Sequence, residues 1–217
     1  MPPTLSIVLK ARNEEAMIPG WLRRLDFADE IVAAVDDRSD DRTAELLVSA
    51  GVKVTTVRFE GFDALVNAAI DLATGDWVFL LDADERVSRL LAAEIRTAVD
   101  GPFDGLRVPT ANYFHAQLMR FGGWQEHPVK LWRRGTARLA GTIHERACFL
   151  IENPRIGELQ TPLAHLKIEG RARLMQIYLG ESDRWRDKPL YIALVEAMRA
   201  NDIAGVTVYR GILGYGA

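Results

Sequence analysis

The chain has 217 residues, of which 48% are hydrophobic and 26% charged, with a formal net charge of −3 at pH 7. This length supports one substantial core with a small appendage, and the nearly balanced charge argues against a general nucleic-acid-binding protein. The N-terminus shows no secretory pattern, and the apolar runs are far shorter than the roughly 20 residues that span a bilayer, so we expect a cytoplasmic protein.

Short apolar runs alternate with helical periodicity over the first hundred residues. The runs expected to be strands are Leu5–Leu9, Ile31–Val35, Val52–Val57 and Trp77–Leu81. The stretches expected to be helices are Ile18–Leu25, Ala44–Val48, Leu65–Leu72 and Leu91–Ala98, the last with Ser88 as its N-cap. This alternation predicts a parallel sheet with helices on both faces. Ligands of such sheets bind beyond the carboxyl ends of the strands, where most of the connecting segments are acidic in this chain.

The pattern becomes irregular from about residue 101 to residue 167. Strand-like pieces at Leu106–Pro109, Val129–Arg133 and Ala137–Leu139 are separated by segments that contain Gly and Pro. A substrate pocket could form in this half. Cys148 is the only cysteine, so it cannot form an internal disulfide, and we expect it to be a small buried hydrophobic residue.

Two carboxylates, Asp82 and Asp84, follow the apolar run Trp77–Leu81. Residues two apart in an extended chain point to the same side, and neighbouring carboxylates repel each other unless a cation joins them. Oxygen ligands suit Mg²⁺ or Mn²⁺, ions that also bind substrate phosphates. A solvated turn that caps the next helix is the alternative. The position directly after a buried strand favours the metal site.

Several motifs in order resemble the family-2 glycosyltransferases, in the branch that contains bacterial lipopolysaccharide-core glucosyltransferases. They are Ser6–Leu9 with Asn13–Glu15, Val35–Thr43, Ala73–Trp77 and Leu81–Glu85, and the resemblance covers roughly residues 4–168. It implies a GT-A domain over residues 1–168, an α/β fold with a Rossmann-like, mostly parallel sheet flanked by helices.

The resemblance also implies an activity in cell-envelope glycan synthesis. A hexose would pass, with inversion and with Mn²⁺ or Mg²⁺, from a UDP- or GDP-type sugar to a hydroxyl group on a glycan or glycolipid. A glycolipid acceptor would bring the protein to the inner face of the membrane as a peripheral protein.

Four residues correspond to positions that bind the donor in the family. The resemblance implies that Glu14 lies beside the nucleotide, that Asp36 with the adjacent Asp37 holds the nucleoside, and that Asn67 contacts the donor. Arg38 stands where the family commonly has Gly, and a positive φ there would be strained for Arg. A polar turn that caps a helix is the alternative for residues 36–41.

The segment Gly141–Glu145 resembles the part of the family in which an acid lies near the acceptor. Inverting transfer needs a base that takes the proton of the acceptor hydroxyl. The resemblance implies Glu145 as this base, with His144 as its neighbour or substitute. A surface turn with two polar residues is the alternative.

Two later residues complete the expected site. His165 resembles the histidine that can join the metal site, where Asp82 would contact both donor and cation, and an imidazole ligand would favour Mn²⁺ over Mg²⁺. A buried core histidine is the alternative. Arg134 is the expected diphosphate partner because a guanidinium matches phosphate oxygens. Its surroundings could equally be a solvated basic edge.

Residues 169–217 do not continue the transferase pattern. Leu174–Leu179 and Val206–Tyr209 are expected strands, and Leu190–Met198 is an expected helix. With Gly180–Trp185, they resemble the opening half of a small PII-like domain with a ferredoxin-like fold. A short β-α-β segment leaves a sheet incomplete, so it could pair between chains and form a homo-oligomer.

Two other functions remain open. A nucleotidyltransferase also uses acidic pairs on an α/β sheet, but it needs a basic phosphate-binding loop after the first strand, which Lys10–Arg12 offers only faintly. A non-enzymatic regulatory or assembly protein governed by the PII-like segment is the other. The absence of G-x-G-x-x-G after the first strand argues against a dehydrogenase.

Overall fold

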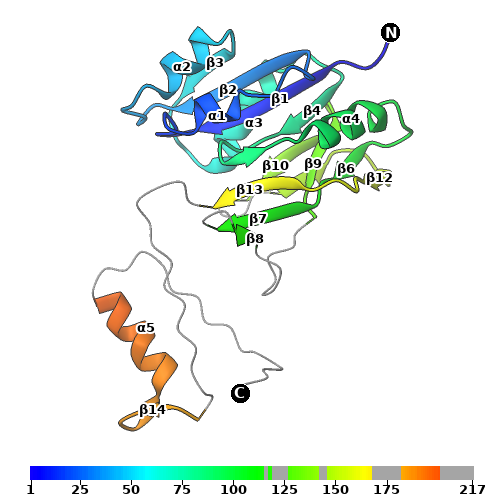
Figure 1. The fold of residues 1–217 in the computed structure, drawn as a ribbon. Coiled ribbons are helices and arrows are strands. Elements are labelled where there is room, and N and C mark those ends of the chain that lie inside the picture. Colours follow the sequence, from blue (N-terminus) through cyan, green and yellow to red (C-terminus); the bar gives the residue numbers. More distant parts are fainter. Residues whose placement is uncertain (115–116, 119–126, 142–145, 168–181, 201–217) are drawn as a thin grey trace. The chain divides into compact units, whose positions relative to one another are not determined.

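The computed structural model describes residues 1–114, 117–118, 127–141, 146–167 and 182–200 (Figure 1). The chain divides into two compact units, Met1–Gly170 and Arg171–Ala217. No helix among the described residues combines the length and the apolar character needed to cross a membrane.

The larger unit is built on a seven-stranded sheet with the order β12-β6-β9-β4-β1-β2-β3. Its strands are β1 (Leu5–Ala11), β2 (Glu30–Asp36), β3 (Lys53–Val57), β4 (Trp77–Leu80), β6 (Gly105–Arg107), β9 (Val129–Arg133) and β12 (Ile156–Glu158). The four strands β4, β1, β2 and β3 are parallel to one another, whereas β9 lies antiparallel between β4 and β6. The predicted parallel sheet is therefore confirmed at its centre and becomes mixed toward β9.

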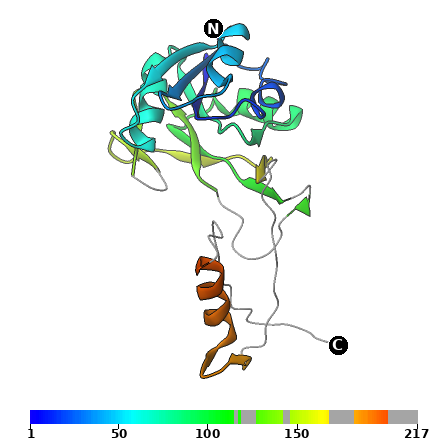
Figure 2. The same cartoon turned by 90° about the vertical axis from the view of Figure 1, so that its left-hand side faces the viewer.

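Helices cover both faces of this sheet (Figures 1 and 2). Strand alternation divides β1 between two apolar clusters: Leu5, Ile7 and Leu9 pack on one face, and Val8 packs on the other. The first face is covered by α1 (Ile18–Trp21), α2 (Thr43–Ser49) and α4 (Arg89–Ala98), and the second by α3 (Phe62–Leu72). Ser88 is the N-cap of α4, because its Oγ accepts a hydrogen bond of 3.1 Å from the backbone N of Leu91.

A second sheet of four strands has the order β5-β13-β7-β8. Its strands are β5 (Glu85–Arg86), β7 (Thr110–Phe114), β8 (Gln117–Leu118) and β13 (Leu163–Lys167). β13 is antiparallel to β5 and parallel to β7, and this pairing sets His165 opposite Glu85. Figure 1 shows β13 and β7 running side by side below the main sheet. A late segment of the chain is thereby placed against the turn that follows β4.

β10 (Ala137–Ala140) and β11 (Arg146–Phe149) form a separate antiparallel pair. Side chains of β11 alternate between exposed and half-buried positions, and Cys148 occupies an exposed position. The expectation of a buried cysteine was wrong, because β11 has only one covered face.

The motif Ala73–Trp77, which carried part of the resemblance, has a structural role at the amino ends of the strands. Glu30 accepts hydrogen bonds from the Ser6 hydroxyl at 2.5 Å and from the Thr74 backbone N at 2.8 Å. The Gly75 N–H donates to the Ser6 hydroxyl at 2.9 Å. A Cβ on Gly75 would lie 2.7 Å from Ser6 Oγ and 2.9 Å from Ser6 N, so a side chain does not fit there. This network joins β1, β2 and β4 at the edge away from their carboxyl ends.

One predicted helix is much shorter than expected. The periodicity of Ile18–Leu25 predicts two turns, but α1 ends at Trp21. Gly20 weakens the helix, and Arg24 has a φ of 68°, which lies in the left-handed region. The apolar residues at helical spacing still reach the core, since Ile18 and Leu25 are both buried.

In the smaller unit, β14 (Arg184–Trp185) pairs antiparallel with β15 (Lys188–Pro189), and α5 (Leu190–Ala200) follows. The predicted helix Leu190–Met198 is confirmed within α5. The expected strands Leu174–Leu179 and Val206–Tyr209 lie outside the described residues.

Candidate functional site

A cavity of about 870 Å³ lies beyond the carboxyl ends of β1, β2 and β4. This is the edge at which parallel sheets of this kind bind ligands. Residues expected from the sequence that line it are Glu14, Asp36, Asp82, Asp84 and His165. The structure therefore brings together five predicted residues that are up to 151 positions apart in the chain.

The turn after β4 is held by its own backbone and side chains. The Asp82 N–H donates to Glu85 Oε2 at 2.9 Å, and the Glu85 N–H donates to the Asp82 carbonyl at 3.0 Å. Arg86 Nη1 donates to the carbonyls of Ala83, at 2.6 Å, and of Glu85, at 2.9 Å. The turn thus has a fixed shape that keeps the side chains of Asp82 and Asp84 at the cavity, where they are 30% and 38% exposed.

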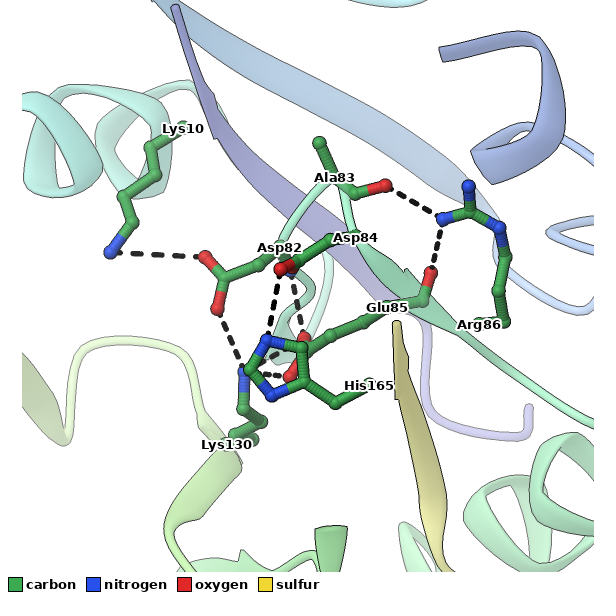
Figure 3. Close-up of polar contacts among 8 residues, drawn as sticks. All are labelled: Lys10, Asp82, Ala83, Asp84, Glu85, Arg86, Lys130 and His165. Atoms are coloured by element: carbon green, nitrogen blue, oxygen red, sulfur yellow. Dashed lines mark hydrogen bonds and ion pairs between the residues drawn. The ribbon is translucent and has the colours of Figure 1, made fainter. Parts of the chain in front are cut away.

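His165 contacts this turn from the second sheet (Figure 3). The backbone N–H of Leu166 donates to the Asp84 carbonyl at 2.8 Å, and His165 Nε2 lies 2.9 Å from Asp84 Oδ2. The histidine side chain is 22% exposed and faces the cavity. It is therefore not a core histidine enclosed by apolar residues.

Asp82 is held by two lysines, as Figure 3 shows. Its Oδ2 accepts a hydrogen bond of 3.1 Å from Lys130 Nζ, and its Oδ1 lies 3.7 Å from Lys10 Nζ. Burial alone would raise the pKa of Asp82, but Lys130 and Lys10 lower it to about 2. Asp82 is consequently ionised and largely neutralised by its neighbours.

Lys130 is a buried ammonium group between two carboxylates. It is 7% exposed, and besides Asp82 it contacts both oxygens of Glu85, at 2.7 and 2.8 Å. Burial would lower the pKa of Lys130, but Asp82 and Glu85 raise it. Burial raises the pKa of Glu85, an effect that Lys130 opposes. Because β9 is antiparallel to β4, its first residues lie beside the carboxyl end of β4, which explains how Lys130 reaches this turn.

The donor atoms at the turn suit a divalent cation in part. The Asp84 carboxylate and the His165 imidazole are 2.9 Å apart, and a mixed oxygen and nitrogen set of this kind suits Mn²⁺. Both Asp82 oxygens instead face ammonium groups. Within the described part of the chain, no group of three or more His, Cys, Asp or Glu side chains has the arrangement of a metal site. Asp84 and His165 therefore fit a cation better than Asp82 does.

Glu14 adds negative charge to the same cavity. Its backbone N–H donates to Thr43 Oγ1 at 2.8 Å, which ties the segment after β1 to the start of α2. Burial raises the pKa of Glu14, and the charges of Asp84, Asp41 and Asp82 raise it further. The carboxylates around Asp84 thus repel one another in spite of the two lysines, so a bound cation would be favoured there.

Asp36 at the end of β2 is almost fully buried and is covered by Arg38. Arg38 Nε donates to Asp36 Oδ1 at 2.9 Å and Nη2 donates to Oδ2 at 2.6 Å, so both carboxylate oxygens are engaged. These hydrogen bonds outweigh burial and lower the pKa of Asp36 to about 2. The Arg38 guanidinium also lies over the Phe59 ring, 4.2 Å from its centroid. Arg38 is not among the residues with positive φ, so the strain considered for this position does not arise.

Three predicted donor-binding residues are not brought to the cavity. Asn67 forms two hydrogen bonds with the backbone of Leu139, at 2.9 and 3.1 Å, so its amide anchors β10 to α3. Asp37 is exposed and does not line the cavity. Arg134 donates from Nε to the Gly75 carbonyl at 2.8 Å, beside the start of β4 and at the opposite end from Asp82. We therefore leave these three residues out of the proposed site. His144 and Glu145 lie outside the described residues.

Sequence reasoning considered Lys130 as part of a basic segment that could hold an anionic acceptor, but it missed the pairing of Lys130 with Asp82 and Glu85. Lys130 carried a signal, because it is a single charged residue between the apolar Val129 and Leu131 in a strand. A lysine in such a position is expected to have a buried counter-ion. Nothing in the sequence pattern alone indicated that Glu85 would be this counter-ion.

Comparison with known proteins matches the two parts of the chain to two different families. A family model described as "Glycosyl transferase family 2" matches residues 6–145. A second model, described as "Uncharacterized ACR", matches residues 172–217. It agrees with the separate character of the C-terminal segment.

Two curated relatives show how much of a longer protein the chain represents. An undecaprenyl-phosphate 4-deoxy-4-formamido-L-arabinose transferase of Pseudomonas paraeruginosa is 33% identical over 166 residues, covering 67% of this chain and 45% of the relative. A TPR repeat-containing protein of Synechococcus elongatus is 35% identical over 100 residues, covering 45% of this chain and 25% of the relative. The chain thus spans less than half the length of either relative.

Among solved structures, residues 1–349 of S. aureus TarS superpose with a TM-score of 0.59 at 17% sequence identity, covering 75% of this chain and 60% of that TarS fragment. The same fragment in complex with UDP-GlcNAc gives a TM-score of 0.58 at 17% identity, covering 79% of this chain and 62% of the fragment. The likeness confirms the predicted fold, a GT-A-type α/β arrangement with a large, mostly parallel sheet.

Proposed function

The chain belongs to glycosyl transferase family 2, and we propose that it transfers a hexose from a nucleotide-diphosphate sugar to a hydroxyl group on a glycan or glycolipid, with inversion of the anomeric centre. The observation that carries this proposal is the convergence of Asp84 and His165, 2.9 Å apart, beside Asp82 in the cavity beyond β1, β2 and β4. Carboxylates at this edge repel phosphates by themselves, but with a bound cation and with Lys10 they suit a ligand that carries phosphates.

In the proposed complex the nucleoside lies at the end of β2, beside Asp36, and the diphosphate lies at the turn after β4. Lys10 faces the cavity between these two ends, and it replaces Arg134 as the expected cationic partner of the diphosphate. The binding of UDP-GlcNAc by TarS, which shares the fold, supports a nucleotide sugar as the class of donor.

Asp84 and His165 are the residues that we propose to hold Mn²⁺ or Mg²⁺. Asp82 would take part through Oδ1, the oxygen whose contact with Lys10 is the longer of its two lysine contacts. A divalent cation at this turn would supply charge neutralisation for the departing diphosphate. Lys130 and Glu85 hold Asp82 in place from within the core.

The residues proposed for the acceptor side are taken from the sequence resemblance. We propose Glu145 as the base that removes the acceptor proton, with His144 beside it. The name of one relative includes undecaprenyl phosphate, which supports a lipid as the carrier of the acceptor but does not bear on the hydroxyl group. We propose that the chain meets such an acceptor at the inner face of a membrane. We also propose that residues 169–217 form a separate domain and that copies of the chain pair through it.

Thermal shift with nucleotide sugars tests the proposal, because a ligand present at a hundredfold excess over its Kd stabilises a protein by about 2.7 kcal/mol. We expect a UDP- or GDP-sugar to raise the melting temperature only when Mn²⁺ or Mg²⁺ is present. Asp84→Ala should abolish this rise, whereas Asp37→Ala, which removes an exposed carboxylate outside the cavity, should keep it. The proposal would be overturned if none of the nucleotide sugars raised the melting temperature of the unchanged chain.

A further inference from the structure

The carboxylate at the end of β2 lines the cavity but is almost completely covered. Asp36 is 1% exposed, and both of its oxygens accept hydrogen bonds from the Arg38 side chain. Oδ1 also accepts from the Arg38 backbone N–H at 2.9 Å. A ligand that enters this end of the cavity therefore meets the guanidinium of Arg38 before it meets the carboxylate.

Arg38 is held as a flat donor surface. A guanidinium has five N–H groups and no acceptor, and the contacts with Asp36 use the Nε–H and one N–H of Nη2. The side chain lines the cavity and is 47% exposed. One face of the guanidinium lies on the Phe59 ring. Two contacts thus fix its plane and its direction, and the remaining N–H groups are those of Nη1 and the second one of Nη2.

The same wall of the cavity continues toward the turn after β4. Phe59 packs edge-to-face on Phe62, with ring centroids 5.2 Å apart, and Lys10 Nζ lies 5.5 Å from the centroid of the Phe62 ring. Lys10 in turn reaches Asp82. One continuous wall therefore joins Arg38, where the nucleoside is proposed to bind, to the turn proposed for the diphosphate.

We propose that Arg38 contacts the nucleobase and selects bases that present a keto oxygen, uracil or guanine, over bases that present an amino group at the same position, cytosine or adenine. This inference rests on the proposed function, because it places a nucleotide in the cavity. The keto oxygen of uracil or guanine accepts a hydrogen bond, whereas the amino group of cytosine or adenine donates one. A guanidinium facing an amino group would leave donors on both sides without an acceptor, which costs binding energy.

Arg38 has the opposite hydrogen-bonding character to the acid that it covers. A bare carboxylate at Asp36 would accept hydrogen bonds, and because all four bases carry an N–H or amino donor it would not favour the keto bases. Removal of the Arg38 side chain should therefore narrow the preference for keto over amino bases rather than weaken the binding of all four bases equally. That change distinguishes base selection from a general contribution of positive charge.

UDP and CDP provide a matched pair of ligands, since they differ only at the base edge in question, and GDP and ADP provide a second pair. Titration calorimetry with Mn²⁺ should show UDP or GDP bound about tenfold more tightly than its amino counterpart, the value of one well-placed hydrogen bond. In Arg38→Ala this ratio should fall to about threefold or less, with an absolute gain in the affinity for CDP or ADP.

Two further variants separate the alternatives. Arg38→Lys keeps the positive charge but loses the planar fork. The ratio of keto to amino nucleotide affinities should therefore fall, while UDP and GDP still bind. Arg42→Ala, which removes an exposed arginine paired with Glu45 outside the cavity, should leave the ratio unchanged. An equal ratio in the unchanged chain and in Arg38→Ala would overturn the inference and leave the proposed function intact. Binding of none of the four nucleotides would overturn both.

Discussion

His165 Nε2 lies 2.9 Å from Asp84 Oδ2, although 81 positions separate the two residues in the chain. The contact exists because β13 pairs with β5, which begins one residue after Asp84. The second sheet therefore completes the part of the site that the Rossmann-like sheet alone would leave as a bare acidic turn.

Replacement of His165 should remove the proposed nitrogen ligand of the cation. In His165→Ala we expect the stabilisation by Mn²⁺ in the presence of a nucleotide sugar to fall by at least half in a thermal-shift titration. Stability without metal should change little, because the side chain is partly exposed and its described polar contact is with Asp84. An unchanged response to Mn²⁺ would remove His165 from the site.

Loss of the buried ammonium at Lys130 should destabilise the fold. Lys130→Met leaves Glu85 buried without its counter-ion, and breaking a buried pair in this way costs about 3–5 kcal/mol. Denaturant unfolding measures this free energy. The double variant Lys130→Met with Glu85→Gln removes the unpaired charge, so it should recover part of the loss. Equal stability of the single and double variants would contradict the account of this pair.

A methyl group at Gly75 should disturb the amino ends of β1 and β4. In Gly75→Ala the new Cβ would lie 2.7 Å from Ser6 Oγ and 2.9 Å from the Ser6 backbone N. We expect a loss of about 2 kcal/mol in the free energy of unfolding. Gly20→Ala is the control, because its Cβ would meet only the end of the Arg86 side chain, at 3.1 Å. A loss in the control as large as in Gly75→Ala would refute the steric explanation.

Acid should weaken the fold through Glu30. Burial would raise its pKa, but hydrogen bonds from Lys53, Ser6 and Thr74 lower it to about 2 from the ordinary 4.5. Because the folded pKa lies below the unfolded one, this stabilisation is complete above about pH 4.5 and is lost as the pH falls toward 2. It amounts to at most about 3–4 kcal/mol, since one pKa unit corresponds to about 1.36 kcal/mol.

Glu30→Gln should remove this part of the pH dependence. Unfolding free energies measured between pH 6 and pH 2.5 should converge for the variant and the unchanged chain as the pH falls. A constant difference across this range would show that Glu30 is not the group that titrates.

The sequence predicted the elements whose pattern is local. The apolar run Trp77–Leu81 contains β4, which is buried on both faces. The acids that follow the run reach the cavity because the chain leaves the sheet at the carboxyl end of this strand. Ser88 was expected as a cap and is one. These features depend on neighbours within a few positions.

The remaining features depend on pairing between distant segments. Lys130 reaches Asp82 only because β9 enters the sheet antiparallel to β4, which no local pattern of residues specifies. Asn67 and Arg134 match family positions, yet their side chains bond to the backbone of Leu139 and Gly75. A motif gives the residue type, whereas the direction of a side chain depends on what packs beside it.

The measurement that tests the central claim most directly is product analysis after incubation of the unchanged chain with a UDP- or GDP-sugar and Mn²⁺. We predict release of the nucleoside diphosphate, by transfer or slow hydrolysis, at a rate that falls at least about a hundredfold in Asp84→Ala and stays unchanged in Asp37→Ala. Release of a sugar 1-phosphate, with transfer of the nucleoside monophosphate, would indicate nucleotidyl transfer instead. Full activity of Asp84→Ala would contradict the site proposed at the turn after β4.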